Sequence, residues 1–437
     1  MKILRTLGVA LMCVSSVRVS AAQEATTPIQ RLAGTWAGTI GTSGTASIVL
    51  TFSNDSVPVH GTFDALGSGV FAWPVQVSPD TADTLRLTLP NGWVFRARIA
   101  DAEISGVLAG NGKSAPFVVH RAGSATPPYT AEAVVFQSGG VALSGTLLSP
   151  SDRGPVPAVV FAHGSGPMDR TADNFLGGYL ARRGIAVLLY DKRGVGKSTG
   201  EWRGASLDDL AADAVAGVRL LRARSGIDLN RVGVAGRSQG GQLAVISAGR
   251  YPEVAFAINV AGSLVSPWRQ MNYELAASMT RDGFSSEDSA AAQAIMNEKW
   301  TVARTGNGWD SLAARVLRIR AENPAWIEYV QLPDKLSDIR DSWEGQMGFE
   351  YGPVLAHLTK PLVGLFGERD TSTPTEETVA ALRTGLRESR NTLATIRVYE
   401  SADHALLIWQ DDTAELELPT YPPDYPEILA RWIHDLR

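Results

Sequence analysis

The sequence is poor in cysteine and in clustered positive charge. Its 437 residues contain a single cysteine, Cys13, which lies in a segment that we expect to be removed. A mature chain without cysteine excludes disulfides, a thiol nucleophile and a cysteine-based metal site. Lys and Arg total 40 against 45 Asp and Glu, for a net charge of −5 without a basic run. Because nucleic-acid surfaces need clustered Lys and Arg, we expect no nucleic-acid partner.

Long apolar runs are also missing beyond the start of the chain. Segment 1–22 carries Lys2 and Arg5, then an apolar run over 7–14 that is too short to cross a bilayer, then small residues suited to cleavage. This order predicts a signal peptide and an exported protein, periplasmic or extracellular. No later stretch is long and apolar enough to form a membrane span.

Residues 27–122 have the pattern of antiparallel strands. Runs such as "TASIVLTF" and "TLRLTLP" alternate apolar and polar residues between Gly, Asn, Asp and Pro turns. We therefore predict a small β-rich barrel or sandwich. Residues 123–130, with small residues and two prolines, are predicted to be a linker.

Residues 131–437 have a different rhythm, in which a predicted hairpin is followed by strands that alternate with helices. The strands are near-continuous runs of Val, Ile, Leu and Ala, which is typical of a mostly parallel sheet covered on both faces. Residues 263 to about 350 interrupt this alternation with a helical block, which we expect to cover a site at the sheet edge. Its tryptophans are expected to pack in a core: Trp268, Trp300, Trp309, Trp326 and Trp343.

Ser238 lies in "GRSQGG", residues 236–241, between an apolar strand and a predicted helix. The glycines would make a turn in any case. On so sharp a turn, however, they also relieve crowding around a strained backbone that holds the serine above the sheet. The context therefore favours a nucleophile.

A serine nucleophile needs an imidazole base further along the chain. Three histidines follow Ser238, namely His357, His404 and His434. His404 stands in a loop directly after a predicted strand, and we take it as the base. The other two lie in helical stretches, where surface or core histidines are common.

The acid that orients the base should follow the preceding strand, where "GERDTSTP" offers Glu368 and Asp370. We favour Asp370, because the following residues turn the chain toward a helix, and we keep Glu368 as the alternative. Asp403 adjoins His404 and is expected to be a solvated loop charge, since a sequence neighbour rarely reaches back to that ring.

Attack on a carbonyl also requires donors for the oxyanion. One is expected to be the backbone N–H of Gln239, at the start of the helix. The other is expected from "HGSGPMDR", residues 163–170, where we choose the N–H of Ser165. His163 is expected to be structural.

Residues 131–437 resemble the α/β-hydrolase superfamily, and most closely its serine-esterase branch. The likeness rests on five segments in order: "HGSGPMDR", "YDKRGVGKSTG", "GRSQGG", "GERDTSTP" and "SADHALL". The resemblance implies an α/β-hydrolase fold with a helical cap at about 263–350, with the β-rich domain before it as an addition to the common core.

The resemblance also implies site residues. It implies Ser238 as nucleophile, Asp370 as acid and His404 as base, with oxyanion donors at Ser165 and Gln239, and it implies no metal or organic cofactor. Arg237 departs from commoner members, which often carry histidine there.

Other functions are compatible with parts of the sequence. The segment "DKRGVGKST" nearly matches a phosphate-binding loop, but Asp191 replaces its first glycine, and a carboxylate there would repel phosphate. A serine peptidase or thioesterase, or a non-catalytic binding protein, are alternatives on the same fold. We predict a serine carboxylesterase acting on a small-molecule ester, with its oligomeric state open.

Overall fold

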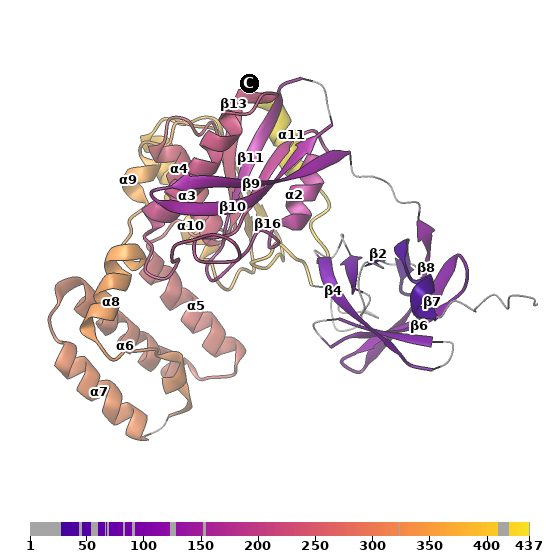
Figure 1. The fold of residues 1–437 in the computed structure, drawn as a ribbon. Helices are drawn as coiled ribbons and strands as arrows, with labels where there is room; N and C mark the ends of the chain where they lie inside the picture. The colour runs from indigo at the N-terminus through magenta and orange to yellow at the C-terminus, as the bar shows by residue number, and fades with distance from the viewer. Residues whose placement is uncertain are drawn as a thin grey trace, which may run out of the picture.

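The computed structural model describes residues 28–42, 46–53, 60–65, 67, 70–81, 84–89, 92–122, 128–151, 154–322, 324–409 and 419–436. The predicted signal peptide (1–22) and most of the predicted linker (123–127) lie outside these residues, so export stays a prediction. Figure 1 shows a small β domain and a larger sheet domain from which a group of helices projects. None of the helices in the described ranges combines the length and the apolar character that crossing a membrane requires.

The N-terminal domain is a closed antiparallel barrel. It closes because β1 pairs with both β2 and β8. Inward side chains alternate with outward ones along the strands, and Trp36 is fully buried inside. The strands are β1 (Gly34–Ile40), β2 (Ala46–Ser53), β3 (His60–Ala65), β4 (Val70–Pro79), β5 (Thr84–Thr88), β6 (Val94–Ile99), β7 (Glu103–Gly110) and β8 (Lys113–Ala122).

The sheet domain contains an eight-stranded sheet in the order β16-β15-β14-β13-β11-β12-β10-β9. The first six of these strands run parallel to one another, whereas β10 of the predicted hairpin β9–β10 is antiparallel to both β12 and β9. The strands are β9 (Tyr129–Ser138), β10 (Val141–Pro150), β11 (Val156–Ala162), β12 (Ala186–Tyr190), β13 (Ile227–Arg237), β14 (Ala257–Val260), β15 (Leu362–Gly367) and β16 (Ala394–Tyr399).

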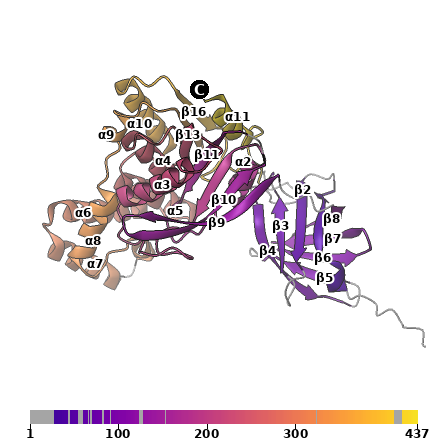
Figure 2. The ribbon, with the colours of Figure 1, turned by 45° about the horizontal axis from the view of Figure 1, so that its top comes forward.

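Helices cover both faces of this sheet, and Figures 1 and 2 show them on opposite sides. One face packs against α3 (Leu207–Arg222), α4 (Gln239–Arg250), α9 (Gly352–Leu355) and α10 (Thr375–Glu388). The other packs against α2 (Asn174–Ala181) and α11 (Glu427–Asp435). The central strands are therefore buried on both faces, which explains their near-continuous apolar runs. The predicted α/β fold with an added β domain is confirmed.

The helical block lies between β14 and β15, and we call residues Pro267–Met347 the cap. Its elements are α5 (Pro267–Arg281), α6 (Ser286–Thr305), α7 (Trp309–Glu322), the 3₁₀ turn η2 (Ala325–Tyr329), α8 (Leu336–Ser342) and the π-turn η3 (Trp343–Met347). The cap has a core of its own, in which Trp300 is buried and the other four tryptophans named above pack at the margin.

Candidate active site

Ser238 sits at the turn between β13 and α4, at the edge of the sheet where the parallel strands end. Its backbone has φ 55° and ψ −126°, a conformation that residues other than glycine rarely adopt. The Ser238 N–H donates to the Val260 carbonyl of the neighbouring strand at 2.9 Å, which helps to hold the strained turn. Such strain is typical of a functional residue held in place by its surroundings.

The glycines beside Ser238 allow two backbone segments to touch. A Cβ atom on Gly236 would lie 2.4 Å from the carbonyl carbon of Gly240, and one on Gly240 would lie 2.1 Å from the Ala162 oxygen of β11. Both distances are shorter than real side chains allow. The motif therefore contains glycine for close packing as well as for the turn.

His404 and Asp370 meet at the same edge of the sheet, after the ends of β16 and β15, which run parallel to β13. Asp370 follows β15, is 1% exposed, and its Oδ2 lies 2.8 Å from Nδ1 of His404. Its Oδ1 accepts the N–H groups of Ser372 and Thr373 at 2.8 and 2.7 Å. Because the second oxygen is held by the backbone, the first has a fixed direction toward the imidazole.

The other acidic candidates have different partners. Glu368 accepts the Ser401 N–H at 2.9 Å and so ties the end of β15 to the loop that carries His404. Asp403 accepts the N–H groups of Ala405 and Leu407 and the Trp409 indole, and thus shapes the same loop. The expectation of a merely solvated charge at Asp403 is wrong, because its carboxylate is a structural acceptor.

The remaining histidines lie elsewhere. Nδ1 of His357 is 2.8 Å from the Pro353 carbonyl, and Nε2 of His434 is 2.7 Å from the Arg183 carbonyl; both rings are exposed. Within the described residues the Ser238 hydroxyl makes no hydrogen bond, to His404 or otherwise. In unliganded enzymes such bonds are often long and tighten only when substrate binds.

A buried lysine organises the loop opposite Ser238. Lys192 is 2% exposed, and its Nζ donates to the carbonyls of Gly164 and Gly166 at 2.9 and 3.2 Å. Because a trans peptide directs its N–H away from its carbonyl, the Ser165 N–H points away from the lysine. We call residues 164–166 the oxyanion loop. Burial lowers the pKa of Lys192 to about 8.

The side chain of Gln239 joins this loop to the cap. Its Oε1 accepts from Lys192 at 3.1 Å, and its Nε2 donates to Oε1 of Gln346 in η3 at 3.0 Å. Its own backbone N–H, the first of α4, and that of Ser165 donate no hydrogen bond among the described residues. Both are therefore free to meet a negatively charged oxygen.

A cavity of about 240 Å³ lies between the turn and the cap. Ser165, Ser238 and Gln239 line its floor, and Met271, Glu274 and Met347 of the cap line its roof. The cap also contacts the loop after β15 that carries Asp370, because the Tyr273 hydroxyl donates to the Asp370 carbonyl oxygen at 2.7 Å. We call this space the cap cavity.

A sequence profile described as the alpha/beta hydrolase family matches residues 159–417, which include Ser238, Asp370 and His404. The chain belongs to the alpha/beta hydrolase family. The match covers the strained serine turn, the cap and the His404 loop in one stretch.

Individual relatives match shorter parts of this hydrolase. A segment of 110 residues is 36% identical to Esterase EstD of Thermotoga maritima, and covers 23% of this chain and 26% of that protein. A segment of 152 residues is 31% identical to an uncharacterised protein of Mycobacterium tuberculosis, over 33% of this chain and 53% of that one. The chain thus matches about a quarter to a half of the length of these relatives. Among solved structures, the Pyrococcus furiosus esterase Pf2001 is similar, with 19% identity and a TM-score of 0.45 over 72% of this chain and 95% of that chain.

In this hydrolase the loop that resembles a phosphate-binding loop is occupied by the carboxylate of Asp191, which belongs to the same segment. Asp191 Oδ2 accepts the Lys197 N–H at 2.9 Å, and its two oxygens receive the Arg170 guanidinium at 2.8 and 2.7 Å. Burial raises the pKa of Asp191, but these hydrogen bonds outweigh it and bring the pKa to about 2. A permanent anion therefore occupies the place where phosphate would have to bind.

Sequence reasoning missed three contributors to the site: Lys192, Tyr273 and Gln346. Lys192 lies in the segment that nearly matches a phosphate-binding loop, and its only signal in the sequence is a lysine two residues after a buried strand. Tyr273 and Gln346 belong to the cap, whose sequence carries no motif. Among the described residues no group of three or more His, Cys, Asp or Glu side chains is arranged to hold a metal ion.

Proposed function

We propose that this hydrolase cleaves carboxylic esters with Ser238 as nucleophile, His404 as general base and Asp370 as its orienting acid. The observation that carries the proposal is the 2.8 Å contact between His404 and a buried, backbone-held Asp370 at the sheet edge where Ser238 is strained. A serine on such a turn, with a carboxylate-held imidazole nearby, is the arrangement that activates a hydroxyl for acyl transfer.

The proposed reaction has two halves. Ser238 Oγ attacks the acyl carbon while His404 takes its proton, and the N–H groups of Ser165 and Gln239 stabilise the oxyanion. His404 then protonates the departing alcohol, leaving an acyl-enzyme, and water repeats the steps to release the acid. Throughout, Asp370 holds the imidazole tautomer and stabilises its charged form.

The cap cavity favours short substrates. A volume of about 240 Å³ is below the range of about 300–1,000 Å³ typical of sites for drug-sized ligands. Met271 and Met347 give it an apolar, adaptable roof, which suits a short acyl chain. We therefore expect the highest kcat/KM with esters of short acids.

The test uses a chromogenic short-acyl ester and a fluorophosphonate label, with wild type, Ser238→Ala and the exposed control Ser225→Ala. Ser238→Ala is expected to lose at least about 10³-fold in kcat and all labelling, whereas Ser225→Ala retains both. Turnover by Ser238→Ala equal to that of the wild type would remove the assignment.

Hydrolysis of substrates that carry an amine is a second candidate. It is favoured by Glu274, whose carboxylate lines the cap cavity together with Ser238 and would attract an ammonium group. L-Alanine 4-nitroanilide distinguishes the two candidates. Cleavage that falls in Glu274→Gln, while ester turnover is kept, supports the amine-directed activity, and no cleavage by the wild type eliminates it.

A further inference from the structure

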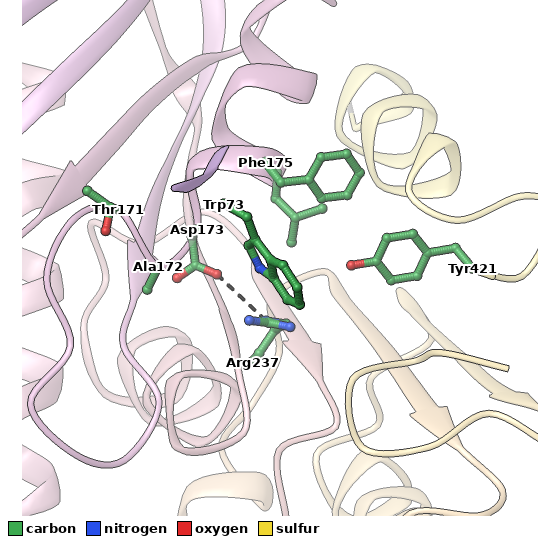
Figure 3. A pocket seen from close by; sticks show the side chains of 8 residues that line it. Trp73, Thr171, Ala172, Asp173, Phe175, Arg237 and Tyr421 are labelled. Carbon is green, nitrogen blue, oxygen red and sulfur yellow. Dashed lines mark ion pairs between the residues drawn. The ribbon is translucent and has the colours of Figure 1, made fainter. Parts of the chain in front are cut away.

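A second cavity, of about 210 Å³, lies where the barrel meets the sheet domain. Trp73 of β4 forms the wall on the barrel side, and Asp173, Phe175, Arg237 and Tyr421 come from the sheet domain (Figure 3). The Tyr421 N–H donates to the Gly67 carbonyl of the barrel at 2.9 Å, so the two domains are in direct contact here. We call this space the interdomain cavity.

Arg237 is a cation in this wall that has an ion-pair partner, Asp173, but no hydrogen bond among the described residues. It directly precedes Ser238, and its side chain is 33% exposed toward the cavity. Its buried Nε forms a long ion pair with Oδ1 of Asp173 at 3.7 Å, which is beyond hydrogen-bond distance (Figure 3). None of its nitrogens makes a hydrogen bond within the described ranges. A guanidinium has five N–H donors, and leaving them unmet in a partly closed site is costly unless a ligand supplies acceptors.

The other walls suit a flat apolar group beside an acceptor. The rings of Phe175 and Tyr421 stack with centroids 5.6 Å apart and an interplanar angle of 6°. Figure 3 shows the Tyr421 hydroxyl and the Trp73 ring pointing toward the space above Arg237. In the described part of the chain that hydroxyl has no hydrogen-bond partner. It is therefore a second donor next to the guanidinium.

We propose that the interdomain cavity binds a small carboxylate attached to a flat apolar body, and that this ligand acts on the reaction at Ser238. Arg237 and Tyr421 donate to the carboxylate, and Trp73 and Phe175 enclose the apolar body. Asp173 lies beside the same guanidinium and repels further negative charge. The site therefore accepts a monoanion in preference to a phosphate dianion. Because Trp73 supplies one wall, the site exists only when the barrel is docked.

Binding is tested on the full-length Ser238→Ala protein, so that the result does not depend on turnover. Calorimetric titration with benzoate is expected to show binding at least about tenfold tighter than with benzyl alcohol or inorganic phosphate. Arg237→Gln and Trp73→Ala are each expected to weaken benzoate at least about tenfold, whereas Asp173→Asn tightens it because a like charge is removed. Trp73→Ala leaves the sheet domain's own residues unchanged, so it remains informative if Arg237→Gln does not fold.

The proposal is overturned if benzoate does not bind, or if Trp73→Ala and Arg237→Gln bind it as tightly as the Ser238→Ala parent protein does. It is also overturned if Asp173→Asn abolishes binding, since the pair would then be structural. Loss of esterase activity in Ser238→Ala tests the proposed function separately and has no effect on this titration.

Kinetics with the wild type identify where the carboxylate comes from. If it is part of the substrate, the mono-4-nitrophenyl ester of glutaric acid has a kcat/KM at least about tenfold above that of 4-nitrophenyl pentanoate, and Arg237→Gln removes the advantage. If it is a separate ligand, added benzoate changes turnover of the neutral ester in the wild type and not in Arg237→Gln. If neither effect appears, the cavity does not act on the reaction and the proposal fails.

Discussion

His163 gives this protein a pH-dependent stability that can be calculated from its surroundings. The ring directly precedes the oxyanion loop and is 3% exposed, and its Nε2 lies 2.5 Å from the Tyr190 carbonyl. Its Nδ1 is buried without a partner in the described residues, so a proton added there would be unsolvated. Burial, the largest influence, lowers the pKa of His163 to about 4, even though the hydrogen bond to Tyr190 acts to raise it.

The sign follows from comparing the folded and unfolded states. An unfolded histidine has a pKa of about 6.5, so below that pH the unfolded chain binds a proton that the folded chain resists. The contribution of His163 to stability is therefore complete above about pH 6.5 and is lost as the pH falls toward about 4. Between about pH 7 and about pH 5 the expected loss in the free energy of unfolding is about 2 kcal/mol.

Urea unfolding measures this loss. The helical circular dichroism signal reports on the sheet domain and cap, because the barrel contains only the short helix α1 (Pro28–Arg31) among its described residues. The wild type and the exposed control His434→Asn are expected to lose about 2 kcal/mol more than His163→Asn between the two pH values. Equal losses in the wild type and His163→Asn would refute the reasoning that this ring is buried in its neutral form.

Two further predictions concern the architecture around Ser238. Lys192→Met is expected to fold but to lose about 10–100-fold in kcat/KM for a chromogenic ester, because the oxyanion loop loses the buried cation that fixes its carbonyls. Unchanged kinetics would contradict that role. Gly240→Ala is expected to lower the thermal midpoint by several degrees or to prevent folding, because the new Cβ would lie 2.1 Å from the Ala162 oxygen. A calorimetric scan that matches the wild type would show that glycine is not required for this close contact.

The sequence alone determined the fold class and the segments that form the site. Alternating apolar and polar runs specify strands with one solvent-exposed face, and near-continuous apolar runs specify strands buried on both faces. Both patterns are local properties of the chain. The glycines around Ser238 likewise indicate a close contact between backbone segments, because a side chain at these positions would collide with the neighbouring backbone. For these reasons the antiparallel β domain, the mostly parallel sheet, the cap and the serine turn could all be predicted, whereas the choice between a barrel and a sandwich came from the structure.

Only the tertiary structure decided which side chains meet. The sequence favoured Asp370 but kept Glu368 as an alternative, and the fold places Asp370 against His404 while Glu368 accepts the Ser401 N–H. It also placed Lys192 under the oxyanion loop and brought Trp73 of the barrel next to Arg237. Each of these contacts joins segments that are distant in the chain. Such contacts depend on how whole elements pack, and the pattern of apolar and polar residues within one segment carries no record of its partner.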